Sequence, residues 1–182
     1  MGKVFKYISD EVIGKYGFID HCQICNKKTQ LVNIFIENEK EDILLTEACI
    51  NCIKTIPLEW ICHKSDERLI PNLINIKYPK GTKSQDERFA LTVNMASEYR
   101  RTPYLPNLGI EIDWPKCCGD FAEFIGDAGS TYKDPLEGFE WWGFEDDYAK
   151  TTGIEKMMQS DDKVSLFKCS DCNKKFWTYQ CT

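Results

Sequence analysis

Three Cys-x-x-Cys pairs are the residues of this chain best suited to chemistry: Cys22/Cys25, Cys49/Cys52 and Cys169/Cys172. Two thiolates separated by two residues can bind one tetrahedral Zn²⁺, because a tight turn directs both sulfur atoms inward while its amides hydrogen-bond to them. The first and third pairs are near-copies, and Asn-Lys-Lys follows each. Asn26 and Asn173 suit the left-handed backbone position that such a turn often needs. The pattern predicts a protein that zinc holds together.

The first two pairs predict one complete metal site. Cys22 and Cys25 precede a predicted strand pair, and Cys49 and Cys52 lie in the first turn of a predicted helix. A knuckle, a hairpin and a helix that supplies two ligands is the plan of treble-clef and zinc-ribbon folds. The positive end of the helix dipole favours the thiolate forms that zinc requires. Four thiolates leave no coordination position open, so we expect a structural Zn²⁺ here. The alternative is a group of unligated cysteines in the core.

The third pair predicts a second site whose ligand set stays open. Cys117 and Cys118 are the obvious source of further ligands, although sequence neighbours seldom both reach one ion, so either residue alone could take part. Alternative ligands for the fourth coordination position are Cys62, His63 and Cys181. The alternative is a hairpin tip with buried free thiols. The candidate metal ligands are therefore eight cysteines: Cys22, Cys25, Cys49, Cys52, Cys117, Cys118, Cys169 and Cys172.

Other cysteine chemistry has weaker support. The N-terminal segment lacks the apolar run of a signal peptide, which favours a reducing cytoplasm and leaves a disulfide framework as the alternative. Thioredoxin-type exchange needs a Cys-x-x-Cys pair at a strand-to-helix turn, whereas the first and third pairs lie at predicted hairpin turns. A Cys62–His63 dyad is conceivable, but adjacent residues seldom point toward one another. The sequence has no phosphate loop, His-Glu-x-x-His or nucleophile elbow, so we expect no enzyme.

Composition limits the partners. The 182 residues are 42% hydrophobic and carry a formal net charge of -6, which argues for a folded protein and against a general nucleic-acid binder. An acidic surface suits a basic protein partner. No window is long and apolar enough to span a bilayer. The alternative is a zinc-ribbon module that contacts nucleic acid, and it would need Lys27-Lys28 and Lys174-Lys175 to form one basic patch.

The chain is expected to form a single α+β domain over residues 1–182. Its N-terminal zinc-knuckle subregion would span residues 1–80, and a helical subregion closed by a C-terminal knuckle hairpin would span 81–182. Four groups of elements are predicted. Two strands at 31–36 and 43–45 are joined by an acidic turn at 37–42, and a short helix begins near Cys49 with Ile53 and Ile56 buried. Near the C-terminus, strands at 164–169 and 175–179 form a hairpin. A helix over 144–158 is also predicted, although Gly153 within it disfavours a continuous helix.

Two further helices are predicted from apolar spacing. Ser84 and Glu87 form a capping-box signature that opens a helix ending before Pro103, and Phe89, Val93, Ala96 and Tyr99 would lie on one face of this helix. A second helix would carry Phe121, Phe124, Ile125 and Ala128 and end at Gly129. The connector 134–143 contains Trp141-Trp142, which either closes the core or, with Phe144, forms an exposed binding patch, and the core is favoured.

Taken together, these motifs resemble the CbrC family of cysteine-rich bacterial colicin-tolerance proteins, in order and over nearly the whole chain. The matching segments are Phe5-Lys-Tyr7 with Gly17-Phe18, Cys22-Gln-Ile-Cys25, Cys49-Ile-Asn-Cys52-Ile53, Arg101-Thr102-Pro103, the block from Trp114 to Gly126, and Leu166-Phe-Lys-Cys169-Ser-Asp-Cys172. This chain departs from the family pattern at three positions. Tyr104 replaces a glycine, Cys117 replaces a histidine, and Ala122 replaces the second cysteine of the block. If the block supplies ligands, the second site is altered here, and Cys117 could replace the histidine directly.

The resemblance implies a function as well as a fold. It implies a non-enzymatic toxin-tolerance or immunity protein that binds and neutralises a cognate antibacterial toxin, such as a nuclease. The negative net charge suits that task, because nucleases carry basic substrate clefts.

Overall fold

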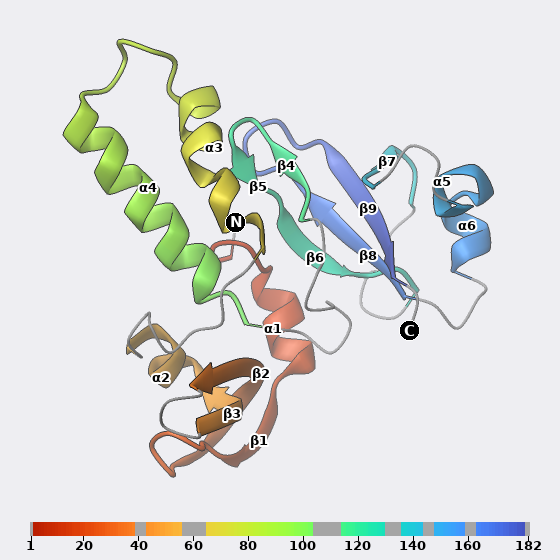
Figure 1. Cartoon of the computed structure of the whole chain (residues 1–182). Coiled ribbons are helices and arrows are strands. Elements are labelled where there is room, and N and C mark those ends of the chain that lie inside the picture. Colours follow the sequence, from red (N-terminus) through yellow and green to blue (C-terminus); the bar gives the residue numbers. More distant parts are fainter. Residues whose placement is uncertain are drawn as a thin grey trace.

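Two antiparallel hairpins, each with a Cys-x-x-Cys pair in its turn, form the frame of the α+β fold (Figure 1). The computed structural model describes residues 2–38, 43–55, 65–103, 114–129, 136–143, 148–158 and 163–180. Helices and strands both occur, so the predicted fold class is confirmed. Among the described residues, no helix combines the length and the apolar character that a membrane span requires.

The N-terminal hairpin belongs to a three-stranded sheet in the order β1-β2-β3. Its strands are β1 (Phe18–His21), β2 (Lys28–Asn38) and β3 (Ile43–Cys49), and helix α2 (Ile50–Thr55) follows directly. Both predicted strands and the short helix are confirmed. Ile53 is buried as predicted, whereas Ile56 and residues 39–42 of the acidic turn lie outside the described residues. The antiparallel register pairs Leu31 with Cys49 on one side and with Phe18, the first residue of β1, on the other.

The C-terminal hairpin lies in a four-stranded sheet in the order β6-β8-β9-β7. The strands are β6 (Glu123–Asp127), β8 (Lys163–Lys168), β9 (Lys175–Gln180) and β7 (Phe139–Trp141), and β7 runs parallel to β9. The predicted hairpin is confirmed. The connector prediction missed the strand β7, but Trp141 and Trp142 pack against buried clusters, as the core interpretation expects. Phe144 lies outside the described residues.

The predicted helix around Phe121 is wrong. Residues 120–121 form β5 and residues 123–127 form β6. Phe124 belongs to the main core cluster, whereas its neighbour Ile125 packs against a second cluster on the other side of the sheet. A strand that is covered on both faces carries apolar residues at successive positions, and such a short run cannot be told from a helix by its spacing.

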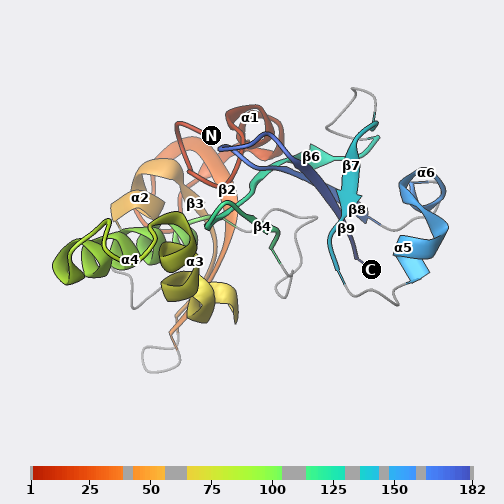
Figure 2. The same ribbon diagram turned by 90° about the horizontal axis from the view of Figure 1, so that it is seen from above.

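The helices surround these sheets in separate groups (Figures 1 and 2). Their bounds are α1 Asp10–Tyr16, a short 3-10 helix η2 Ser65–Leu69, α3 Ile70–Lys77, α4 Gln85–Arg100, α5 Tyr148–Thr152 and α6 Ile154–Met157. The predicted helix over 144–158 is confirmed in part, because α5 and α6 are separated at Gly153, where φ is 84°. Residues 144–147 are not described.

Helix α4 begins as the sequence predicts but faces another way. The Ser84 side chain accepts from the Glu87 amide, and the Glu87 side chain accepts from the Ser84 amide, so the capping box is confirmed. Tyr99 is buried together with Met95, whereas Phe89 and Val93 are 71% and 46% exposed. The four residues grouped from the sequence therefore do not form one buried face.

One core cluster joins the chain from the N-terminus to β9. The N-terminal segment runs beside β6, where the Ser9 amide donates to the Phe124 carbonyl at 2.9 Å and the Phe124 amide donates to the Tyr7 carbonyl at 2.8 Å. Residues from Phe5 to Phe176 contribute to this cluster, including Leu31. Its members thus come from both sides of the expected division at residue 80, which stays a prediction.

Candidate metal centres

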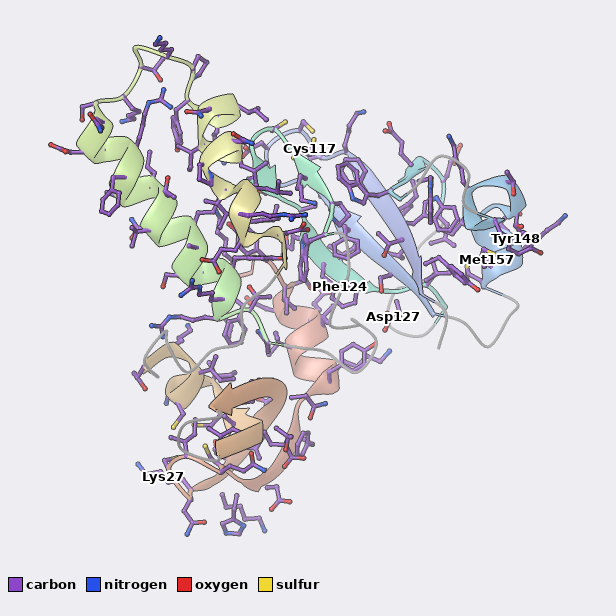
Figure 3. The ribbon with its side chains drawn as sticks, in the orientation of Figure 1. Lys27, Cys117, Phe124, Asp127, Tyr148 and Met157 are labelled. Carbon is purple, nitrogen blue, oxygen red and sulfur yellow. The ribbon has the colours of Figure 1, made fainter. Side chains whose placement is uncertain are left out.

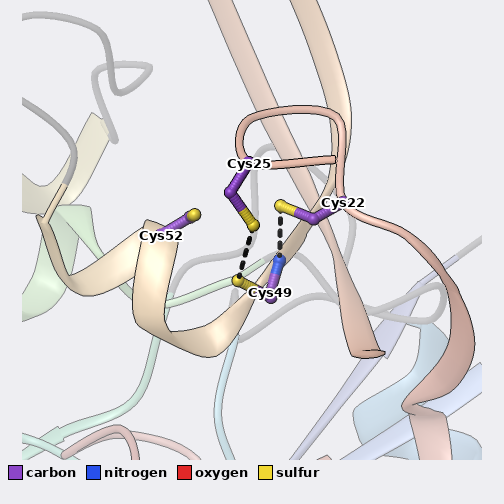
Figure 4. A group of neighbouring side chains, drawn as sticks. All are labelled: Cys22, Cys25, Cys49 and Cys52. Carbon is purple, nitrogen blue, oxygen red and sulfur yellow. Dashed lines mark hydrogen bonds between the residues drawn. The ribbon is translucent and has the colours of Figure 1, made fainter. Parts of the chain in front are cut away.

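The first cysteine tetrad lies between the β1–β2 turn and the start of α2 (Figure 4). The sulfur atoms of Cys22, Cys25, Cys49 and Cys52 all lie within 4.8 Å of one another. Cys25 Sγ is 3.9 Å from Cys49 Sγ, and the Cys49 amide donates to Cys22 Sγ at 3.3 Å. β3 ends at Cys49 and α2 begins at the next residue, so Cys52 lies in the first turn of the helix as predicted, whereas Cys49 is the last residue of the strand before it.

The electrostatics of this tetrad favour a thiolate at one position. Burial by itself would raise the pKa of Cys22, but amide donors from Cys25, Cys49 and Ile24 lower it to about 6. The pKa of Cys52 is raised, first by burial and then by the sulfur atoms of Cys49, Cys25 and Cys22. Four sulfur atoms at this spacing cannot all carry negative charge unless a cation lies among them.

The second tetrad combines two hairpin turns. Cys169 and Cys172 come from the β8–β9 turn, and Cys117 and Cys118 come from the turn between β4 (Lys116–Cys117) and β5 (Asp120–Phe121). Cys117 Sγ lies 3.5 Å from Cys172 Sγ and 3.8 Å from Cys118 Sγ. Figure 3 labels Cys117 at this turn. The structure therefore brings both adjacent cysteines into the tetrad, whereas the sequence left open whether only one would take part.

A left-handed turn allows both adjacent cysteines to reach the same point. Cys118 has a φ of 54° and Gly119 a φ of 75°, and Cys117 pairs with Asp120 across this two-residue turn. Two positive φ values suit the tight hairpin turn whose twist matches that of the flanking strands. A left-handed residue other than glycine costs roughly 1–2 kcal/mol, which indicates that the position of the Cys118 sulfur matters.

Charge is distributed unevenly in the second tetrad as well. The Lys174 amide and then the Cys117 side chain lower the pKa of Cys172 to about 7. Burial, followed by the sulfur atoms of Cys172, Cys169 and Cys118, raises the pKa of Cys117. The hydrogen-bonded knuckle supplies the more acidic thiol in this tetrad, as Cys22 does in the first.

Both tetrads fit a tetrahedral ion with four sulfur ligands. Zn–S bonds of about 2.3 Å place the sulfur atoms of a tetrahedron about 3.8 Å apart. The three short sulfur separations, from 3.5 to 3.9 Å, lie close to this value. A disulfide would need about 2.05 Å, and the eight described cysteines are all free thiols. Each tetrad could hold a metal ion, and an all-sulfur set is consistent with zinc.

The two knuckles share one backbone pattern. The Cys22 amide donates to the Lys27 carbonyl at 3.0 Å, and the Asn26 amide donates to the Cys22 carbonyl at 2.8 Å. The corresponding distances are 2.7 Å from the Cys169 amide to the Lys174 carbonyl and 3.0 Å from the Asn173 amide to the Cys169 carbonyl. Asn26 and Asn173 have φ values of 56° and 63°, so the predicted left-handed asparagines are confirmed.

The residues inside each Cys-x-x-Cys pair attach the knuckle to its surroundings. Gln23 Oε1 accepts from the Thr46 and Glu47 amides at 2.8 and 3.0 Å, which holds the first knuckle on β3. Asp171 Oδ2 in the second knuckle lies 3.0 Å from Lys77 Nζ of α3. The sequence did not predict either contact, although Gln23 and Asp171 lie at positions where the two near-copies differ.

The buried carboxylate of Asp120 lies next to the second tetrad in the chain and forms a network of charged contacts there. Asp120 is 3% exposed and lies 2.8 Å from Lys6 Nζ and 3.0 Å from Lys77 Nζ, and the Tyr7 hydroxyl donates to it at 2.9 Å. Burial would raise the pKa of Asp120, but the two ammonium groups and the hydroxyl keep it below its usual range. Burial would lower the pKa of Lys77, but Asp120 and Asp171 raise it to about 12. Asp120 and Lys77 therefore both stay ionised at neutral pH.

Other predicted site residues have separate outcomes. Cys62, His63 and Cys181 lie outside the described residues. Ala122 is 1% exposed, and its carbonyl accepts from the Trp114 indole at 2.6 Å, so the position that the resemblance linked to a second cysteine serves the core. Figure 3 places Lys27 far from Cys117, whose sulfur lies 3.5 Å from that of Cys172 in the turn that carries Lys174. The two lysine pairs therefore do not form one basic patch. Lys174 pairs instead with Glu140 at 3.1 Å.

One of the comparisons with known proteins identifies the family of this chain. No curated protein and no solved structure matches the sequence. The model of an uncharacterised protein family, UPF0167, matches residues 3–181, which include all eight cysteines of the two tetrads. Since this match covers nearly the whole sequence, the chain belongs to the uncharacterised protein family UPF0167.

Proposed function

We propose that each tetrad holds one structural Zn²⁺ and that the chain acts without catalysis, by binding another protein. The observation that carries this proposal is that each sulfur set is closed. Four protein ligands fill a tetrahedral ion, so no position remains for a water or a substrate. The bound ions would cross-link the β1–β2 turn to α2 and the β4–β5 turn to the β8–β9 turn. They would thereby make rigid the surface that a partner meets.

The proposed partner is a cognate antibacterial toxin, as in the CbrC family. Support comes from the resemblance in motif order and from the net charge of -6, which complements the basic cleft of a nuclease. The outer side of α4 adds two exposed apolar side chains, Phe89 and Val93, one helical turn apart and preceded by Asp86. Exposed aromatic residues are common anchors of protein interfaces. These features favour an acidic protein-binding surface.

Metal analysis tests the first half of the proposal. Elemental analysis of the purified chain should give two zinc ions per molecule, and Co²⁺ replacement should give the absorption of a tetrahedral four-sulfur site. Cys22→Ser and Cys169→Ser should each remove one ion, whereas the control variants Cys62→Ser and Cys181→Ser should keep both. Retention of two ions in Cys169→Ser, or a cobalt spectrum with a water ligand, would contradict closed four-sulfur sites.

Binding experiments test the second half. The C-terminal domain of a secreted toxin encoded beside this chain should co-purify with it and lose its toxicity. Phe89→Ser should weaken that complex, whereas Asn94→Ala, at an exposed position on another side of the same helix, should not. Labelled DNA and RNA at about 150 mM salt serve as the opposing arm, because salt at this level suppresses weak phosphate contacts. Tight nucleic-acid binding without a toxin complex would favour the zinc-ribbon alternative.

A further inference from the structure

Solvent reaches the two tetrads to different extents. In the first, Cys22 and Cys49 are 1% and 7% exposed, whereas Cys25 and Cys52 are half-buried. In the second, only Cys169 is buried, at 3%, whereas Cys118 and Cys172 are exposed. Oxidation of cysteine follows solvent access to the sulfur. The second tetrad is therefore the more accessible of the two to a small oxidant in solution.

Geometry selects one pair of sulfur atoms in the second tetrad. Cys117 Sγ and Cys172 Sγ are 3.5 Å apart, which is shorter than the 3.8 Å between Cys117 Sγ and Cys118 Sγ and the 3.9 Å between Cys25 Sγ and Cys49 Sγ in the first tetrad. Side-chain rotation must reduce this distance to about 2.05 Å for a disulfide to form. Cys117 and Cys118 are a poor pair, because consecutive Cα atoms lie about 3.8 Å apart and disulfides usually need about 4.4–6.8 Å. The geometry favours a bond between the two hairpin turns.

Contacts that involve no sulfur hold these two turns together. Lys77 Nζ lies 3.0 Å from Asp120, which follows the β4–β5 turn, and 3.0 Å from Asp171 in the β8–β9 turn. Gly119 packs so closely on α3 that an added Cβ would lie 2.5 Å from the Lys77 amide nitrogen. These contacts do not depend on a metal, so Cys117 and Cys172 stay within reach of one another when an ion leaves.

We propose that the second tetrad is a site of thiol oxidation by hydroperoxides, at which Cys117 and Cys172 form a disulfide and the metal ion is released. This inference rests on the proposed zinc occupancy of the second tetrad. One thiolate attacks a peroxide oxygen, the O–O bond breaks, and the leaving hydroxide takes up a proton. The second thiolate attacks the resulting sulfenic acid and expels hydroxide, which also becomes water. Two sulfur atoms lose two electrons, the peroxide gains them, and Zn²⁺ keeps its charge.

The first tetrad of the same molecule serves as the internal control. The two-zinc protein is treated with hydrogen peroxide while a chromogenic chelator records zinc release, and peptide mapping then locates disulfides. One zinc should leave at least about ten times faster than the other, because the access of oxidant differs. The mapped bond should join Cys117 to Cys172. Equal release rates, or a first bond between Cys22 and Cys25, would overturn the proposal.

Variants separate this proposal from the metal assignment. Cys118→Ser should still form the Cys117–Cys172 disulfide, whereas Cys117→Ser should not. Chelator-treated protein should form the same disulfide with peroxide, so the pair can be mapped even if the purified chain holds no zinc in the second tetrad. Absence of zinc from the second tetrad would contradict the proposed function, but the oxidation of Cys117 and Cys172 could still be measured. A Cys118–Cys172 bond in the native chain would overturn the assigned pair.

Discussion

The side-chain nitrogen of Lys77 lies 3.0 Å from Asp171 Oδ2, so an ion pair joins helix α3 to the turn of the second knuckle. The same nitrogen lies 3.0 Å from the buried carboxylate of Asp120, which follows the other turn of the tetrad. Lys77 thus contacts both chain segments that supply sulfur atoms. An ammonium on a flexible stem can bridge two carboxylates, and here the bridge aligns two hairpins from separate parts of the sequence.

Lys77→Met should destabilise the protein by roughly 1.5–3 kcal/mol, because Asp120 would lose a charged hydrogen-bond donor while it stays buried. Asp171→Asn should cost no more than about 1 kcal/mol, because that end of the bridge is partly exposed. Urea unfolding of the zinc-loaded variants measures both free energies. Equal losses in the two variants would show that Asp120 does not depend on Lys77.

Gly119→Ala should be far more harmful than Gly81→Ala. Both glycines have positive φ values, 75° and 92°. A Cβ at Gly119 would lie 2.5 Å from the Lys77 amide nitrogen and 2.6 Å from the Leu73 carbonyl oxygen, whereas a Cβ at Gly81 would meet nothing within 4 Å. Gly81→Ala should cost roughly 1–2 kcal/mol from its backbone alone. Thermal unfolding and zinc content should show an additional loss for Gly119→Ala, and similar values for the two variants would refute the close packing on α3.

Cys118→Gly should stabilise the metal-free fold but weaken the binding of the second zinc ion. In chelator-treated protein, glycine relieves the left-handed strain and should stabilise the fold by about 1 kcal/mol relative to Cys118→Ser. In zinc-loaded protein, both variants lack one sulfur ligand and should bind the second ion more weakly than the native chain. Unfolding curves in the two conditions, with competition for zinc by a chelator, check both effects. No difference between glycine and serine without metal would mean that the turn is unstrained.

Tyr7 should make the protein lose stability in alkali. Burial, followed by the charge of Asp120, raises the pKa of Tyr7 well above its usual value. The unfolded chain releases this proton near pH 10 while the folded chain keeps it, so the unfolded state gains stability as pH rises. The contribution is fully present below about pH 10 and decreases above it.

Comparison with Tyr7→Phe isolates this contribution. The variant should be less stable at pH 8, because Asp120 loses a hydrogen-bond donor, but its stability should fall less steeply between about pH 10 and 11.5. Urea unfolding across this range gives the two slopes. Parallel curves would indicate that Tyr7 ionises normally in the folded protein.

Local signals predicted much of the frame and of the first site. The near-copy knuckles share their cysteines, asparagines and backbone hydrogen bonds, because these features depend on six consecutive residues. The capping box at Ser84 is equally local. By contrast, the residues that differ between the knuckles, such as Gln23 and Asp171, contact β3 and α3. No local pattern identifies partners that lie so far along the chain.

The strand β6 and the buried face of helix α4 were also not predictable from local sequence patterns. Phe124 and Ile125 look helical in sequence because burial on both faces of a sheet removes the alternation that marks a strand. Phe89 and Val93 look like core residues because apolar spacing carries no information on which side of α4 the rest of the chain packs. Both errors come from contacts that form only when distant elements meet.

The sequence by itself determined where sulfur ligands occur and how each knuckle turns, because backbone geometry and capping act over a few residues. Only the tertiary structure decided that Cys117 and Cys118 both complete the second tetrad, and that the first tetrad has two buried and two partly buried cysteines while the second has two exposed ones. The grouping of the second tetrad depends on the packing of the β4–β5 turn on α3 and on the Lys77 bridge. The physical reason is that grouping of ligands and access of solvent are properties of packed elements and not of residue spacing.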